Sequence, residues 1–468
     1  MQIKKGDSLP LNNVGVSYSN NETTIDLKGS YPLDIAVMDI QLDEILSVSY
    51  CLIKNDYTVV NPELIQSQEN RVVVPFNKEQ IRYLKIVATD NVSVENLEII
   101  VDSGIAAVPN EEWTDLFNRK KGWTGADGLY SVPLDGVDKA LNSKDRGSVF
   151  VFGDTFIGEV DSKSHNRIGS TMVNNTIGTI RGVEPEEDKI EFHWRKEKDG
   201  TPQSFFLPTT NKGNSIRDSY YWLQDGVVIN SRFYCMPMIV GPNPDGPEGF
   251  EFDVHGITCV STAIKDGKLD KESEQQVDTP LYFMSDNDKT TYFGAAFMRT
   301  DEDKETVYIY GLQNGDHTEL VVAKVNEDDF TNFDKWLFWD GIKWIDRKES
   351  VKSIANETSS ELSVSYMSSG PLKGKYVMVF LEWSGSNRLS LFVGDSPVGP
   401  FEEPVRLHYC DEPERGEGIY SYNAKAHPHL SKENELLVSY NVNTAQWDVH
   451  QKDGMIYRPR FVTLKFIY

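Results

Sequence analysis

Short apolar runs separated by polar turns occupy residues 1 to about 105. Runs rich in Val, Ile and Leu fall at 33–37, 46–50, 71–74, 83–87 and 97–101. Runs of this length and spacing are typical of the strands of a β-sandwich. We therefore predict an accessory β-sandwich domain over residues 1–105. Because this segment has no cluster of acids flanked by glycine, we assign it no catalytic role.

A different pattern begins after residues 106–112, which we interpret as a linker. A short helix is expected around 113–119, and the strand-like runs that follow come in groups of about four, each spanning about 70 residues. Five such groups without intervening helices predict a radial repeat of small sheets, which leaves no long sheet edge exposed. We therefore predict an all-β chain in which a five-bladed β-propeller over 112–468 follows the β-sandwich. A pair of stacked sandwiches is the competing architecture.

Charge and apolar content narrow the classes of partner. The chain has 47 basic and 72 acidic residues, and its net charge of −25 would repel a phosphate backbone, so we expect no nucleic-acid partner. No apolar run approaches the roughly 20 residues that cross a bilayer, so we expect no membrane insertion. The charged start of the chain lacks the apolar core of a signal peptide, which predicts a cytoplasmic protein, or an extracellular one if an export signal has been removed. We expect a monomer.

Two acids of the first group occupy positions where chemistry can occur. In a propeller blade, the start of the innermost strand and the loop after the second strand open onto one face, so polar residues there converge on a central funnel. These positions hold Asp127, followed by Gly128, and Asp154, preceded by Gly153. Two carboxyl groups at one opening are the minimum apparatus for cleaving a glycosidic bond, one as proton donor and one as nucleophile or base. The alternative is that each Asp only hydrogen-bonds the backbone of its turn.

The same geometry selects further side chains in the other groups. Glu361 lies immediately before the inner strand of the fourth group, at the position that matches Asp127, and Glu382 follows the second strand, where it could equally be an ordinary turn acid. Aromatic faces and amide or cationic donors suit the rings and hydroxyl groups of sugars, although such side chains also occur in protein cores. The candidate substrate contacts are Asn175, Asp218, Trp222, Glu382, Tyr422, Asn423, Lys425 and His427.

No motif predicts a metal or a cofactor. The four cysteines are widely scattered, which favours buried free thiols over disulfides or a zinc site. A histidine within a strand, such as His427, is more often hydrogen-bonded in a core than bound to an ion. We therefore expect no required cofactor, and a structural cation in the central channel has no ligand motif to support it.

Several segments resemble a known family. Residues 122–132 (GWTGADGLYSV) and 149–156 (VFVFGDTF) resemble the opening of a poorly characterised group of propeller domains related to endo-D-arabinanases. Residues 422–428 (YNAKAHP), 437–443 (LVSYNVN) and 457–461 (YRPRF) look like the closing signatures of that group. The resemblance covers about residues 120–468. More distantly, the chain is similar to five-bladed arabinanases, xylosidases and fructan-cleaving enzymes.

This resemblance implies a glycoside hydrolase that acts on furanose-containing glycans with three acids in the funnel. Asp127 matches the acid of the first blade, and Asp154 matches the second acid of the arabinanase-related group. The more distant enzymes take their other two acids from blades two and three, whereas the third group here has residues 292–296 (YFGAA), without an acid, at the inner position. The proton donor therefore stays open between Asp154 and Glu361.

The residues and the resemblance together predict a hydrolase of an arabinan-like glycan. In this hypothesis Asp127 is the base or nucleophile, Asp154 is its acid partner, and Glu361 is a third acid that holds substrate or tunes their ionisation. The alternatives are a propeller that binds a glycan without cleaving it and an enzyme that transfers the glycosyl group to another acceptor. In each case the expected partner is an oligo- or polysaccharide.

Overall fold

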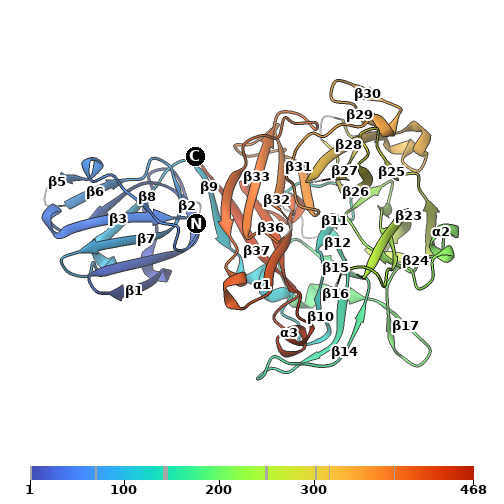
Figure 1. The fold of residues 1–468 in the computed structure, drawn as a ribbon, viewed down its shortest axis with the longest axis horizontal. Coiled ribbons are helices and arrows are strands. Elements are labelled where there is room, and N and C mark those ends of the chain that lie inside the picture. Colours follow the sequence, from blue (N-terminus) through green and yellow to red (C-terminus); the bar gives the residue numbers. More distant parts are fainter. Residues whose placement is uncertain are drawn as a thin grey trace.

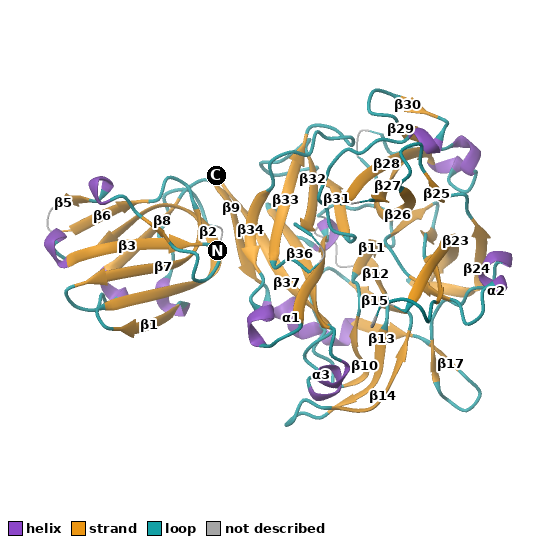
Figure 2. Ribbon diagram, viewed as in Figure 1, coloured by secondary structure: helices purple, strands orange, loops and turns teal. Residues whose placement is uncertain are grey.

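The computed structural model describes residues 3–68, 71–140, 146–247, 251–300, 303–315, 317–383 and 385–468. Strands dominate these residues, and two bodies lie side by side (Figures 1 and 2). The chain is all-β, with a β-sandwich before a β-propeller, as the alternating apolar runs predict. The α-helices of the described part are short: α1 (Glu111–Leu116), α2 (Asn211–Ser215) and α3 (Trp447–Lys452).

The smaller body is a sandwich whose two sheets share one long strand. The first half of β2 (Glu22–Met38) pairs with β1 and β7, and its second half pairs with β6 and β8, so β2 passes from one sheet to the other. The inward faces carry Ile25, Val72, Leu84 and Ile99, all buried in one core. The other strands are β1 (Gly15–Ser19), β3 (Ile45–Cys51), β4 (Thr58–Val59), β5 (Gln66–Gln68), β6 (Arg71–Pro75), β7 (Gln80–Ala88) and β8 (Leu97–Val101).

The larger body is a propeller built from five antiparallel sheets. The innermost strands contact one another in the order β11, β20, β26, β31 and β35. The ring closes between the last and the first of them, where Ser131 Oγ lies 2.6 Å from His427 Nδ1 and the Lys425 ammonium lies 3.9 Å from the centre of the Tyr130 ring. A ring of small sheets of this kind removes long exposed edges.

The strands of the five sheets follow one another along the chain. The first sheet contains β11 (Tyr130–Pro133), β12 (Gly147–Phe152), β15 (Thr176–Arg181) and β16 (Ile190–His193). The second contains β19 (Tyr220–Trp222), β20 (Gly226–Ile229), β21 (Arg232–Cys235), β22 (Met238–Pro242), β23 (Phe252–Lys265) and β24 (Lys268–Asp278). The third contains β25 (Tyr282–Met284), β26 (Thr290–Met298), β27 (Thr306–Asn314), β28 (Thr318–Asn326), β29 (Leu337–Trp339) and β30 (Trp344–Ile345). The fourth contains β31 (Leu362–Tyr366), β32 (Tyr376–Leu381), β33 (Arg388–Gly394) and β34 (Val405–Tyr409).

The fifth sheet is completed by a strand that precedes the propeller in the sequence. It contains β35 (Ile419–Ala426), β36 (Glu435–Thr444) and β37 (Arg458–Ile467), and β37 pairs antiparallel with β9 (Gly104–Pro109). Ser30 of β2 also pairs with Ala107 of β9. Most of the segment that the sequence marks as a linker is therefore a paired strand, and α1 follows it.

Two smaller groups of strands extend from the first sheet. A separate three-stranded sheet contains β10 (Lys121–Ala126), β13 (Thr155–Val160) and β14 (Arg167–Val173). A hairpin contains β17 (Arg195–Lys196) and β18 (Pro202–Gln203). The first of these groups matters for the site, because β10 ends directly before Asp127 and β13 begins directly after Asp154.

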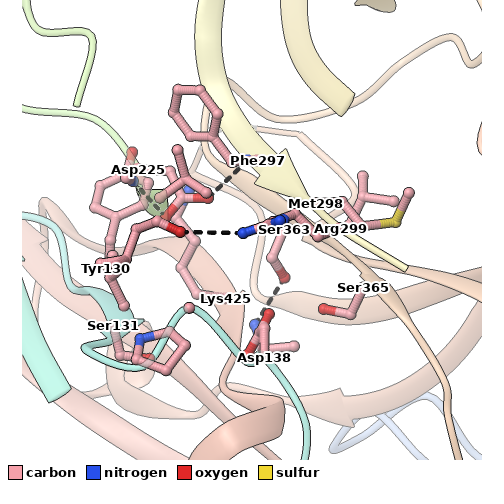
Figure 3. Close-up of a pocket in the computed structure, with 18 residues that line it drawn as sticks. Tyr130, Ser131, Asp138, Asp225, Phe297, Met298, Arg299, Ser363, Ser365 and Lys425 are labelled. Carbon is pink, nitrogen blue, oxygen red and sulfur yellow. Dashed lines mark hydrogen bonds between the residues drawn. The ribbon is translucent and has the colours of Figure 1, made fainter. Parts of the chain in front are cut away.

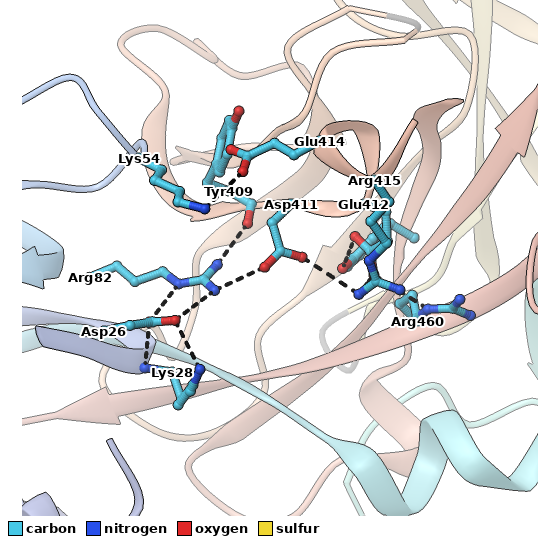
Figure 4. A network of polar contacts seen from close by, with 11 residues as sticks. Asp26, Lys28, Lys54, Arg82, Tyr409, Asp411, Glu412, Glu414, Arg415 and Arg460 are labelled. Carbon is cyan, nitrogen blue, oxygen red and sulfur yellow. Dashed lines mark hydrogen bonds and ion pairs between the residues drawn. The ribbon is translucent and has the colours of Figure 1, made fainter. Parts of the chain in front are cut away.

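An ionic network joins the sandwich to the propeller (Figure 4). The Arg82 guanidinium, only 5% exposed, donates to Asp26 in its own domain at 3.1 Å, and across the junction to Asp411 at 3.1 Å and to the Tyr409 carbonyl at 3.2 Å. Lys54 forms an exposed pair with Glu414 at 3.3 Å. Because Arg82 is buried and its donors are engaged on both sides, we expect it to contribute most of the polar energy of the junction.

Arg82→Met tests this junction. The substitution leaves the Asp26 carboxylate without its main partner and the Tyr409 carbonyl without its Arg82 donor, so we expect a loss of about 1–3 kcal/mol in the free energy of unfolding. Denaturant unfolding followed by tryptophan fluorescence measures the loss. The matched control is Arg71→Met, since Arg71 is 46% exposed in its pair with Asp39 and its loss should cost under about 1 kcal/mol. Equal effects of the two substitutions would contradict the assignment.

Candidate functional site

Two main-chain hydrogen bonds hold the loops of Asp127 and Asp154 together. The Asp127 N–H donates to the Asp154 carbonyl at 2.7 Å, and the Gly153 N–H donates to the Asp127 carbonyl at 2.8 Å. Gly128 turns the chain after Asp127 with φ +61°, and a Cβ there would lie 3.1 Å from the Asn423 amide nitrogen. The two predicted acids therefore stand on paired loops at the same end of the first sheet, and both side chains are half-buried.

The environment of Asp154 favours its protonated form. Burial, followed by repulsion from the Asp127 carboxylate, raises the pKa of Asp154 to about 7. The Asn174 amide donates to Asp154 Oδ1 at 3.2 Å and opposes the shift, as does the indole N–H of Trp222. An acid with a pKa near neutrality can deliver a proton at neutral pH.

Asp127 lies beside tyrosine hydroxyl groups. Burial raises the pKa of Asp127, while the Tyr422 hydroxyl and the Gly128 N–H favour its charged form. Burial, followed by the nearby Asp127 charge, raises the pKa of Tyr422 and of Tyr457, both buried. The neutral Tyr422 hydroxyl can donate to the Asp127 carboxylate, which partly offsets the effect of burial on its pKa.

Two further acids reach the same end of the propeller axis. Asp225 directly precedes β20 and Glu361 directly precedes β31, while two residues separate Asp127 from the start of β11. Because the inner strands of a propeller run in the same direction, residues before their first positions meet at one end. We call Asp127, Asp154, Asp225 and Glu361 the acid cluster.

A buried lysine balances part of this charge. Lys425 is 2% exposed and donates to the Leu362 carbonyl at 2.8 Å. Burial lowers its pKa, and the carboxyl groups of Glu361 and Asp225 oppose that shift. Burial raises the pKa of both acids, and Lys425 favours their charged forms. The ionisation of Lys425, Glu361 and Asp225 is therefore coupled, and protonation of one of them changes the pKa of the other two.

A small cavity lies along the axis next to this group (Figure 3). It has a volume of about 50 Å³, room for a few water molecules, and Tyr130, Asp225 and Lys425 line one end of it. The Asp225 carboxylate accepts from the main-chain N–H groups of Gly226 at 2.8 Å and Phe297 at 2.9 Å. Asp225 is thus fixed by backbone on two neighbouring sheets.

Several buried polar atoms near the acids make no hydrogen bond of normal geometry to the described residues. They include the Trp222 indole nitrogen, the Tyr422 hydroxyl and the Asn423 side-chain oxygen. The pairing of β35 with β36 shifts between Tyr422 and Lys425, and Asn423 has φ +57°, so a local bulge turns these side chains. Buried polar atoms are normally satisfied, so a concentration of open ones marks a place where a polar ligand can bind.

Two buried arginines hold the loops behind the acids. Arg167 donates to the carbonyls of Thr124 at 3.0 Å, His450 at 3.1 Å and Ile456 at 2.9 Å. Arg458 donates to the Thr124 carbonyl at 3.0 Å and to the Arg119 carbonyl at 2.8 Å. Both tie the segment before Asp127 to the end of the chain that carries Tyr457.

Four predicted substrate contacts have other roles in the structure. Asn175 is fully buried, where it accepts from the Phe206 N–H at 2.8 Å and donates to the carbonyls of Phe206 and Tyr221. His427 is fully buried between Ser131 and Ser439, at 2.6 and 2.8 Å. The Glu382 carboxylate is occupied by Arg388, Ser390 and Arg406 on the outer strands of the fourth sheet, and Asp218 is exposed beside Arg217. Their binding capacity is therefore used within the fold or faces solvent outside the acid cluster.

Three residues near the acids were not predicted from the sequence. Asp225 precedes an apolar run, 226–229, in the same way as Asp127 and Glu361, and that signal could have identified it. Asn174 directly follows β14, next to the predicted Asn175, and Tyr457 directly precedes β37; their proximity to the acids depends on packing between distant segments.

The described residues give no sign of a metal centre or a membrane span. No group of three or more His, Cys, Asp or Glu side chains in these ranges could hold a metal ion. Cys51, Cys235, Cys259 and Cys410 are buried and unpaired, as predicted. No helix in the described part is long and apolar enough to cross a bilayer.

Comparisons with solved structures bear on the fold alone. A crystal structure of a candidate hydrolase from Bacteroides ovatus has a TM-score of 0.59 at 16% identity, covering 77% of this chain and 90% of that one. A levansucrase variant of B. megaterium has a TM-score of 0.41 at 11% identity, covering 76% and 90%. A GH43_1 enzyme of Xanthomonas citri, complexed with xylotriose, has a TM-score of 0.36 at 10% identity, covering 76% and 93%.

Sequence comparison shows the family more directly. No curated protein matches the sequence. Residues 110–466 match a family described as a domain of unknown function, DUF5005. Since the match spans all five sheets of the propeller and most of the chain, this protein belongs to the DUF5005 family.

Proposed function

We propose that this protein is a glycoside hydrolase that cleaves a furanose-containing glycan, arabinan-like in kind, at the acid cluster. In this proposal the five sheets are the five blades of the propeller, and the acids lie at the end where the inner strands begin. One observation carries the proposal: two half-buried carboxyl groups stand on hydrogen-bonded loops, and the pKa of one of them is raised to about 7. Glycosidic cleavage requires a pair of carboxyl groups, one of which still holds its proton near neutral pH.

The roles follow from the surroundings of each acid. Asp154, whose pKa lies near neutrality, donates a proton to the leaving oxygen. Asp127, beside the Tyr422 hydroxyl, acts as the charged base or nucleophile. Glu361 and Asp225 share the charge of Lys425 and set the electrostatic field in which the first two acids ionise.

The open polar atoms supply contacts for the sugar. The Trp222 indole N–H and the Tyr422 hydroxyl lie beside Asp154 and Asp127 without a hydrogen bond of normal geometry, and Asn423 presents an amide oxygen that makes none within the described protein. These groups also favour a second function, a propeller that holds a glycan without cleaving it or that passes the glycosyl group to another acceptor. Turnover on a panel of arabinans and fructans separates these functions from hydrolysis.

Asp127→Asn and Asp154→Asn should each lower kcat/KM by about 10²–10⁴-fold, because each removes one of the two proton-transfer or nucleophilic groups. Reducing-end release on the best substrate of the panel measures the loss. Asp218→Asn, which removes an exposed carboxylate outside the acid cluster, is the matched control and should keep full activity.

Thermal unfolding checks that these variants fold. The pKa of Asp154 is raised in the folded state, so ionising it opposes folding as pH rises from its ordinary range through about 7. Asp154→Asn should therefore unfold at the same temperature as the wild type or higher at pH 8. Full activity in a well-folded Asp127→Asn or Asp154→Asn variant would refute the assignment.

Asn174→Ala tests the role of Asp154 through pH. The Asn174 amide favours the charged carboxylate, so its loss should raise the pKa of Asp154. If Asp154 is the proton donor, activity is lost as pH rises through this pKa, and the alkaline limb of the kcat/KM profile should move to higher pH. If Asp154 is the base instead, the acidic limb would move. Asn214→Ala, an exposed amide on α2, should move neither limb.

A further inference from the structure

A second cavity, of about 360 Å³, lies in the fifth sheet. It is enclosed by the 3₁₀ turn Glu412–Arg415, the starts of β35 and β37, the end of β36, and α3 with the segment that follows it. The cavity that lies along the propeller axis is much smaller, about 50 Å³, and has no residue in common with this one. Nothing in the proposed reaction uses the larger cavity.

The cavity and the acid cluster share two segments of chain. Ile419 and Ile456 line the cavity. Burial, followed by the nearby Asp127 charge, raises the pKa of the residues that follow them, Tyr420 and Tyr457. Consecutive residues of an extended chain point to opposite sides. Ile419 and Tyr420 lie in β35, so the partition there is one chain thick, whereas Ile456 and Tyr457 form a bend, with φ +69° at Tyr457, that links the cavity lining to the acids.

The lining is apolar at the back and polar at the mouth. Val442 and Ile456, 1% and 5% exposed, form an apolar surface, and Val449 of α3 faces it. Gln446 and Glu417 are exposed lining residues, and their side chains make no hydrogen bond to any residue that the structure describes. An apolar face with open hydrogen-bonding groups around it suits a sugar ring, which has an apolar face and hydroxyl groups at its edge.

Fixed charges form one side of the cavity (Figure 4). The Glu412 carboxylate is buried and held by the Tyr440 hydroxyl at 3.0 Å and by Arg460 Nε at 3.3 Å. Arg460 also donates to the Met455 carbonyl at 2.8 Å. With Glu417 and Asp453, the lining carries three acids against Arg415 and Arg460, so it disfavours an anionic ligand.

We propose that this cavity is a second carbohydrate site, which binds one neutral sugar ring of the same glycan that the acid cluster receives. This proposal takes the class of ligand, a glycan, from the proposed function, but it does not depend on cleavage of that glycan. A sugar in the cavity would contact the Ile456–Tyr457 segment and hold Tyr457 in place beside Asp127. Because only a long glycan could reach both the cavity and the acid cluster, the site would favour long chains over short ones.

Calorimetry on the full chain tests the site. The titrations use the Asp127→Asn variant, so that the glycan stays intact. The probes are short and long arabino-, xylo- and fructo-oligosaccharides, and an oligogalacturonide serves as the anionic probe. We expect a neutral long oligosaccharide to bind, and Val449→Trp, which fills the cavity, to weaken that binding by about tenfold or more while leaving binding of the shortest oligosaccharide unchanged. Because Val449→Trp could disturb α3, Glu417→Ala with Gln446→Ala at the exposed mouth is a second variant and should weaken the same binding. Lys452→Ala, exposed on α3 and outside the lining, is the matched control.

The outcomes separate this proposal from the proposed function. Binding that is lost in both cavity variants, without turnover by the wild type on any substrate, would support the second site and overturn hydrolysis. Turnover by the wild type with long-chain binding unchanged in the cavity variants would overturn the second site alone. Preference for the oligogalacturonide, or no binding of any probe to the cavity, would also overturn it.

Discussion

The pair of main-chain hydrogen bonds between the Asp127 and Asp154 loops is the constraint on which the site depends. Side chains change rotamer easily, but two carboxyl groups carried on loops that hydrogen-bond to each other keep their spacing. Arg167 and Arg458 add to this by tying the segment before Asp127 to the segment that carries Tyr457. Their N–H groups donate to main-chain carbonyl oxygens. These hydrogen bonds offset the cost of burying two guanidinium groups and give partners to carbonyls that would otherwise lack them.

Burial of four acids at one end of an axis is costly, and the structure meets the cost in two ways. Asp225 receives two main-chain N–H groups, and Lys425 brings a positive charge between Asp225 and Glu361. Asp154 has an amide partner but no cation, and its pKa is raised accordingly. Burial likewise raises the pKa of Asp225 and of Glu361 to about 7, so what distinguishes the acids is their neighbours: Lys425 beside Asp225 and Glu361, and the Asn174 amide beside Asp154.

The sequence was sufficient for the architecture and for part of the site. Apolar runs with turns between them identified the strands, and glycine beside an acid before an inner strand identified Asp127, while Glu361 came from the matching position. Asp225 was not among the predicted residues, because residues 219–222 (SYYW) resemble a strand as much as residues 226–229 do, and the sequence does not show that the inner strand is β20, which begins at Gly226. Asn175 and His427 have the right chemistry for sugar contacts, but distant backbone and hydroxyl groups use their donors, and no local pattern encodes such partners.

Strand β9 gives the molecule a particular order of assembly. Its partner β37 is synthesised only after the whole propeller, so until then β9 has an open edge next to a sandwich that is already complete. Closure of the ring therefore brings together segments that are far apart in the sequence, and it must follow translation of the last sheet. It is expected to be slow because closing a long loop of chain costs conformational entropy. A shortened propeller that begins after Pro109 would lack one strand of its final sheet, so fragments made for biochemical work should retain residues 104–109.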